Sequence, residues 1–146
     1  MSRWRKEAFD RLPECRKQLQ AEKDTTMFFH ELGEVLYRAH LSKDEDLIRR
    51  IYGYAKWCLE APRGKDASDD LLTSVTCSFF EHLPTHKEVR AEIGRWLPRS
   101  MIEGMREVFL YHGSDEKYRE MLASCEVPKS KRPANQSATA NALDLT

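Results

Sequence analysis

Apolar residues recur at the three- and four-residue spacing of an α-helix along most of this chain, and the two-residue alternation of a β-strand is almost absent. The six glycines and six prolines fall mostly between the periodic segments. Both residue types interrupt regular structure, so they mark the turns between helices. The pattern therefore predicts an all-α fold, a compact bundle of about six or seven helices.

The predicted helices can be placed by their start and stop signals. A first helical region over residues 3–20 is interrupted at Pro13, because proline fits the first turn of a helix far better than its interior. Asp24 or Thr25 caps a second helix, over 25–41. Ser42 and Glu45 form a predicted capping box for a helix that runs to residue 60. Further helices are predicted over 68–82, 85–97 (with a second capping box), 99–112 and after Gly113-Ser114.

One internal echo suggests how these helices are arranged. Residues 51–59 before Pro62 carry the same apolar spacing as residues 75–83 before Pro84. Such units stack as antiparallel hairpins in HEAT-type repeats, so the echo indicates a HEAT-like tendency. The alternative is that any two amphipathic helices would align this well.

Composition divides the chain into a domain and a tail. At 146 residues the chain has the length of one domain, and we expect a single helical domain over residues 1–125. Residues 126–146 are rich in Ser, Ala, Asn and Pro, with few bulky side chains. A segment of this kind buries too little apolar surface to offset the entropy of ordering, so we expect a disordered polar tail.

Charge and hydropathy exclude several functional classes. The 24 basic and 24 acidic residues cancel, whereas a dedicated nucleic-acid binder shows a basic excess, so no nucleic-acid partner is expected. The locally basic N-terminus is interleaved with acids and favours a solvated helix face over a phosphate-binding arm. No long apolar run or signal sequence is present, so we expect no membrane association and a cytoplasmic location.

The residues that most often carry chemistry do not form a recognisable catalytic pattern. His82 and His86 have the spacing of two metal ligands on one helix, but Pro84 lies between them and should break that helix. Four widely spaced cysteines form no paired-cysteine motif, and Cys58 and Cys77 lack electropositive neighbours. We therefore predict no catalytic residues, no metal, no cofactor and free buried thiols.

Aromatic residues supply the candidate binding site. They come from successive predicted helices and spread over more than one helix face. Core packing is the first explanation. The alternative is an open groove that binds a partner or ligand, with its lining drawn from Tyr54, Trp57, Phe80, Glu81, His82 and Trp96.

Three segments carry a resemblance to a known group of proteins. They are YGYAKWCL at residues 52–59, SFFEHLP at 78–84 and IGRWL at 93–97. Together they resemble a family of small all-helical bacterial proteins with a domain of unknown function. That family is similar in size and general character to immunity proteins found near polymorphic toxin genes. The resemblance covers residues 25–122, implies a bacterial, cytoplasmic helical domain that binds a protein, and implies no catalytic residues.

These observations predict a protein-interaction module, immunity-like or adaptor in role, and not an enzyme. The alternative is a small-molecule-binding or enzymatic domain with a pocket near Glu81 and His82. Oligomeric state is left open, because Trp4 and Phe9 could form a dimer contact or a last core layer.

Overall fold

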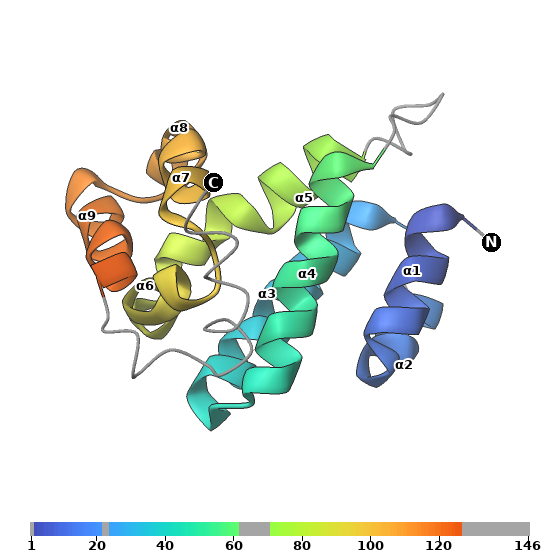
Figure 1. Ribbon diagram of the computed structural model, residues 1–146. Helices are drawn as coiled ribbons and strands as arrows, with labels where there is room; N and C mark the ends of the chain where they lie inside the picture. The colour runs from blue at the N-terminus through green and yellow to red at the C-terminus, as the bar shows by residue number, and fades with distance from the viewer. Residues whose placement is uncertain (1, 22–23, 62–70, 127–146) are drawn as a thin grey trace. The chain divides into compact units, whose positions relative to one another are not determined.

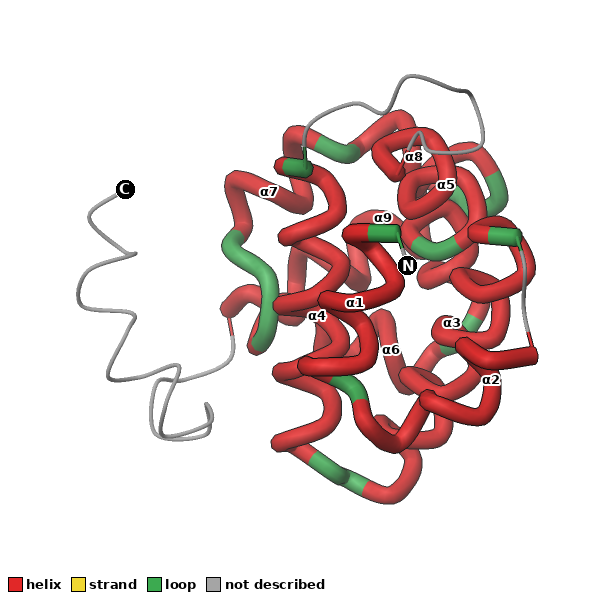
Figure 2. The backbone as a smooth tube through the Cα atoms, turned by 90° about the vertical axis from the view of Figure 1, so that its right-hand side faces the viewer, coloured by secondary structure: helices red, strands yellow, loops and turns green. Residues whose placement is uncertain are grey.

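A computed structural model describes residues 2–21, 24–61 and 71–126. Within these ranges every regular element is a helix and no strand occurs, which confirms the predicted all-α class (Figure 2). The predicted polar tail lies outside the described residues from residue 127 on, and so does the predicted loop from residue 62 on. The chain divides into two compact units, Met1–Leu83 and Pro84–Thr146, which are described separately.

Unit 1 is built around two long helices joined by a tight turn (Figure 1). Helix α3 packs against α4 and α5, α4 packs against α5, and α1 lies on α4. The elements are α1 (Arg3–Arg11), the 3₁₀ helix η1 (Pro13–Cys15), α2 (Arg16–Ala21), α3 (Thr25–Ser42), α4 (Glu45–Glu60), α5 (Leu71–Ser78) and the 3₁₀ helix η3 (Phe80–Thr85), whose last residues belong to unit 2. Helices α3 and α4 form one helical hairpin, while the HEAT-like stacking of hairpins along the chain stays a prediction.

The turn between α3 and α4 differs from the predicted capping box. Ser42 is the last residue of α3, and its hydroxyl donates to the carbonyl of Ala39. Lys43 then adopts a left-handed conformation with φ of 56°, which ends the helix one residue later than predicted. Asp44 is therefore the N-cap of α4, and its carboxylate accepts from the Leu47 amide at 3.2 Å. At the start of α3, Asp24 is the cap, accepting from Thr26.

Two other predicted boundaries were wrong. Pro84 was expected to end a helix over 68–82, but the described part of that segment is α5 followed by η3, which runs through Pro84 to Thr85. Pro84 has no N–H to donate, so η3 forgoes one backbone hydrogen bond at that residue. Consequently His86, and not Thr85, is the N-cap of α6, and no side chain caps it.

Unit 2 contains shorter helices than the sequence predicted. Its elements are α6 (Lys87–Glu92), η4 (Ile93–Arg95), α7 (Arg99–Gly104), α8 (Arg106–Tyr111), α9 (Asp115–Ala123) and η5 (Ser124–Glu126). The helix predicted over 99–112 is interrupted at Met105, where ψ is 18°. Ser114 caps α9 as predicted, accepting from the Lys117 amide.

The core of unit 2 forms where α9 packs against α6 and α7. Arg90 of α6 donates to Glu120 of α9 and to the carbonyl of Pro84, so one guanidinium joins three elements. Gly94 lies so close to the Cys125 backbone that no side chain fits there, and its amide donates to the Ser124 hydroxyl. The buried apolar side chains include Val89, Ile93, Ile102, Phe109 and Met121.

Candidate functional site

The structure separates the residues predicted to line a groove. Tyr54 and Phe80 are fully buried, so they belong to the core and do not line an open groove. Trp96 is 7% exposed and lies in unit 2. Trp57, Glu81 and His82 are half-buried in unit 1 and keep part of their side chains accessible. The candidate surface is therefore rebuilt below from the residues around Trp57.

A continuous cluster of aromatic rings joins α1, α3 and α4 in unit 1. The Phe28 ring contacts Trp4 at a centroid distance of 5.4 Å and Tyr54 at 6.2 Å. Tyr54 stacks on Phe29 on one side and on Trp57 on the other, each at 6.1 Å. Because four of these five rings are buried, the half-buried Trp57 is the edge at which the cluster reaches the surface.

The Tyr54 hydroxyl shows how firmly the N-terminal helix is held on this cluster. It donates to the backbone carbonyl of Trp4 at 3.0 Å. Burial raises the pKa of Tyr54 well above its ordinary value, so the hydroxyl remains a donor throughout the accessible pH range. This bond satisfies a buried polar group and fixes α1 against α4.

Three arginines of unit 1 lie over aromatic rings, and one of them, Arg3, lies over Trp57 at this edge. The guanidinium of Arg3 is 5.4 Å from the centroid of Trp57, that of Arg5 is 5.1 Å from Trp4, and that of Arg16 is 5.8 Å from Phe9. These distances are typical of cation–π contacts. We name the accessible residues of these contacts, together with the exposed Lys6 that lies between Arg3 and Phe9 in the sequence of α1, the basic–aromatic face; it consists of Arg3, Arg5, Lys6, Phe9, Arg16 and Trp57.

The sequence interpretation missed this face. It treated the basic N-terminus as an ordinary solvated helix surface, and Arg3, Lys6 and Arg16 are indeed exposed. What periodicity could not show is that Arg3 meets Trp57 of a helix far along the chain. The available signal was the repeated pairing of arginine with aromatic residues in the first 16 positions, as in Arg3-Trp4-Arg5.

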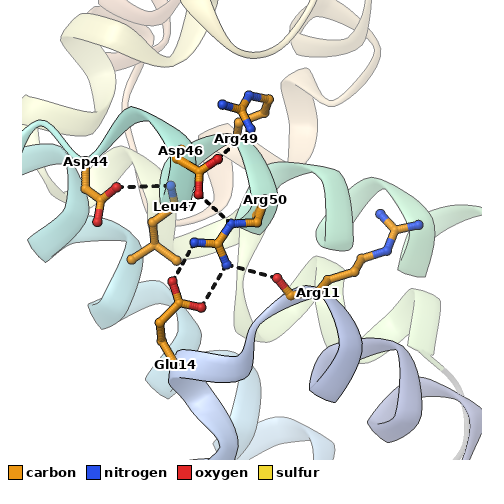
Figure 3. Close-up of polar contacts among 7 residues, drawn as sticks. All are labelled: Arg11, Glu14, Asp44, Asp46, Leu47, Arg49 and Arg50. Carbon is orange, nitrogen blue, oxygen red and sulfur yellow. Dashed lines mark hydrogen bonds and ion pairs between the residues drawn. The ribbon is translucent and has the colours of Figure 1, made fainter.

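A second arginine cluster fixes the other end of α1 (Figure 3). Arg50 of α4 donates to both carboxylate oxygens of Glu14, to Asp46, and at 3.0 Å to the carbonyl of Arg11, the last residue of α1. Together with the Arg3–Trp57 contact, this shows that α1 runs antiparallel to α4, since rising numbers on α1 meet falling numbers on α4.

The charged groups of this second cluster hold elements of unit 1 together. The hydrogen bond from Arg50 lowers the pKa of the Glu14 carboxyl below its ordinary value. Hydrogen bonds from Arg49 and then Arg50 do the same for the pKa of Asp46. The N–H groups of Arg50 named above bond to acceptors within unit 1. Arg50 therefore positions α1 and does not offer a binding site.

The Glu81–His82 region has a different arrangement from the predicted pocket. The His82 ring lies 4.9 Å from the ring of His30, an exposed residue of α3. Cys77 on α5 is exposed, and not buried as predicted. Partial desolvation, followed by the nearby Glu81 carboxylate, raises the pKa of the Cys77 thiol. A raised pKa disfavours the thiolate, so this thiol is poorly suited to act as a nucleophile.

The remaining cysteines divide in the same way between core and surface. Cys15 and Cys58 are buried free thiols, as predicted, and burial raises their pKa values to about 11 and about 12. Cys125 is half-exposed. Across the described ranges, no three His, Cys, Asp or Glu side chains are grouped so that they could hold a metal ion. In the same ranges, no helix combines the length and the apolar character needed to cross a membrane.

Comparison with known proteins identifies the family. No curated protein and no solved structure matches the chain. A family model described as "Domain of unknown function (DUF7674)" matches residues 5–113, which include the described residues of unit 1 from Arg5 onward and unit 2 as far as the end of α8. The match covers well over half of the chain, and the chain therefore belongs to the DUF7674 family.

Proposed function

We propose that this chain is a protein-interaction module and that it binds its partner through the basic–aromatic face of unit 1. The observation that carries this proposal is the half-buried Trp57, which forms the accessible edge of an otherwise buried aromatic cluster and is covered by the exposed Arg3. Tryptophan, tyrosine and arginine supply most of the strongly contributing residues at protein interfaces. The rigid ring stack behind Trp57 supports it in one orientation, which lowers the entropy cost of binding.

Quantitative capture tests this proposal. The tagged full chain and its Trp57→Ala variant are incubated with a lysate of the source cells, and bound proteins are quantified by mass spectrometry. We expect a stoichiometric partner whose recovery falls at least tenfold with Trp57→Ala. The matched control is Tyr111→Ala, which removes the exposed aromatic ring of α8 and should leave recovery unchanged. Equal recovery with Trp57→Ala and the unchanged chain would disprove binding through this face.

The finer form of the proposal is an immunity-like or adaptor role in the bacterial cytoplasm. It is supported by the resemblance described above and by the free cysteines, which suit a reducing compartment. Co-expression with the product of an adjacent gene tests it. Rescue of growth from a toxic gene product would support an immunity role, and unchanged toxicity despite complex formation would favour an adaptor.

A second candidate function is a small-molecule-binding or enzymatic site at Glu81 and His82. The contact between the rings of His30 and His82 favours it, because two imidazoles from different elements converge on an accessible surface. A thermal-shift screen with metabolites tests this candidate. A compound that stabilises the unchanged chain but not a His30→Ala/His82→Ala variant would support it, whereas equal shifts in both would place the compound elsewhere.

A further inference from the structure

The chemistry of the basic–aromatic face indicates what kind of partner it fits. We infer that the face binds a carboxylate-rich segment of a partner protein, recognised by exposed guanidinium groups that lie over aromatic rings. This inference rests on the proposed protein-binding function and adds the chemical class of the partner. It begins with how Arg3 and Arg16 are held.

A cation–π contact holds a guanidinium near an aromatic ring by its charge and does not require its N–H donors. The five N–H donors of the group can then still bind an acceptor. Arg3 over Trp57 and Arg16 over Phe9 are both exposed. Two guanidinium groups are therefore accessible at the surface, and the fork of N–H donors in a guanidinium matches the geometry of a carboxylate in a bidentate contact.

The ion pairs of unit 1 distinguish Arg3 and Arg16 from the arginines that hold its elements together. Arg11 is paired with Glu7 at 3.0 Å, and Arg50 is engaged by Glu14 and Asp46. By contrast, Arg3, Lys6, Arg16 and Lys17 form no ion pair with any carboxylate in the described part of the chain. One acidic residue near these cations, the exposed Asp10, also has no ion pair in that part of the chain. The face therefore carries a local positive excess.

A protein segment fits this face better than a nucleic acid does. The positive excess is local, because the chain as a whole has equal numbers of basic and acidic residues. A polyphosphate backbone requires many cations in a row, and its binding is driven by neutralising many phosphates. Here Glu7, Asp10 and Glu14 interrupt the basic residues along α1 and η1. A short acidic segment needs only a few correctly placed contacts, with apolar side chains between them to cover Phe9 and Trp57.

Peptide binding to the full chain tests the inference directly. The probes are hexaglutamate, hexaglutamine and a thymidine oligonucleotide of matched charge, and binding is followed by the shifts of arginine Nε–H signals in NMR spectra. We expect hexaglutamate to shift the signals of Arg3 and Arg16 and to bind at least tenfold tighter than hexaglutamine. Tighter binding of the oligonucleotide than of hexaglutamate would overturn the inference in favour of a nucleic acid.

Two double variants and one single variant make the test specific. Arg3→Glu/Arg16→Glu should lose hexaglutamate binding at least tenfold, and Arg3→Lys/Arg16→Lys should lose a substantial part of it, because lysine keeps the charge but not the planar fork. Arg119→Glu reverses an exposed charge on α9 and should bind as the unchanged chain does. Full binding by the lysine variant, or equal loss with Arg119→Glu, would overturn recognition by these two guanidinium groups. If the captured partner depends on Trp57 but not on these arginines, the protein-binding function stands and the inference fails.

Discussion

Arginine serves two distinct purposes in unit 1. Arg50 uses its in-plane N–H groups to hold Glu14, Asp46 and the end of α1, so its donors are consumed inside the unit. Arg3 and Arg16 instead lie over aromatic rings and form no ion pair with a carboxylate in the described part of the chain. The same side chain thus holds elements together in one setting, and we propose that it recognises a partner in the other.

Replacing Arg50 with alanine should lower the free energy of unfolding by about 1 kcal/mol, since it removes a partly exposed ion pair with Glu14 and a charged hydrogen bond to the Arg11 carbonyl. The lowered pKa values of Glu14 and Asp46 set the pH dependence of this loss. A carboxyl group whose folded-state pKa is lowered stabilises the fold above its unfolded pKa, and that stabilisation disappears as the pH falls through the folded-state value.

Urea unfolding of the unchanged chain and of Arg50→Ala between pH 7 and pH 2 measures this dependence. The two curves should differ at neutral pH and approach each other as the pH falls below about 4, leaving the part of the difference that comes from the hydrogen bond to the Arg11 carbonyl. A difference that stays constant down to pH 2 would show that Arg50 stabilises unit 1 by packing and not through these carboxylates.

Two glycines should respond in opposite ways to the addition of one methyl group. A Cβ atom at Gly33, inside α3, would have no neighbour within 4 Å, so Gly33→Ala should raise the free energy of unfolding by about 0.5–1 kcal/mol. A Cβ at Gly94 would overlap the backbone of Ser124 and Cys125, so Gly94→Ala should lower it by about 1–3 kcal/mol. Denaturant titration of both variants checks this contrast, and equal effects would contradict the described packing of η5 on η4.

At the scale of the elements, most helices were predictable and their exact ends were not. The apolar period of residues 25–41 and the Asp24 cap define α3 correctly, because both signals are local. The capping box at Ser42 was wrong because its pattern competes with a left-handed Lys43 and a cap at Asp44, and sequence spacing does not rank the two. The break at Met105 follows Gly104, a poor helix former that the prediction of one helix over 99–112 did not weigh.

The corrected cap makes a simple prediction for α4. Asp44→Ala should lower the free energy of unfolding by about 1 kcal/mol, because it leaves the Leu47 amide without its cap. Ser42→Ala should have a smaller effect, since the Ser42 hydroxyl bonds to the Ala39 carbonyl and caps nothing in α4. Thermal unfolding followed by circular dichroism compares the two variants. A larger loss of stability for Ser42→Ala would show that Ser42 caps α4, as the predicted capping box requires.

The candidate site was less predictable than the fold for a physical reason. The sequence pattern showed that the aromatic residues spread over more than one face of their helices. Which of these residues are buried depends on which elements pack together. Tyr54 and Phe80 are therefore core residues, and Trp57 lies at the edge. The arginines beside aromatic residues near the N-terminus were a local signal, but the Arg3–Trp57 contact could not be predicted from it, because that contact joins α1 to the end of α4.

For the molecule as a whole, the family match crosses the boundary between the two units, since it covers residues 5–113 and the boundary follows Leu83. A single domain over residues 1–125 remains our prediction, and it requires the two units to unfold together. Trp4 and Trp57 lie in unit 1 and Trp96 lies in unit 2, so tryptophan fluorescence can follow each unit separately.

A Trp96→Phe variant keeps only the tryptophans of unit 1, so its fluorescence during urea unfolding reports on unit 1. Trp4→Phe/Trp57→Phe keeps only Trp96, so its fluorescence reports on unit 2. Trp96→Phe should be well tolerated, because no hydrogen-bond partner for the Trp96 indole nitrogen occurs in the part of the chain that the structure describes. We expect each variant's fluorescence transition to coincide with its own circular dichroism transition, as in two-state unfolding. Separate midpoints for the two probes would show that the units unfold independently.

The central claim is that the basic–aromatic face binds an acidic protein partner, and calorimetric titration of the captured partner into the full chain tests it most directly. The account predicts saturable binding that weakens at least tenfold in Arg3→Glu/Arg16→Glu and is unchanged in Arg119→Glu. Undiminished affinity of the Arg3→Glu/Arg16→Glu variant would contradict it and would place the binding surface elsewhere on the molecule.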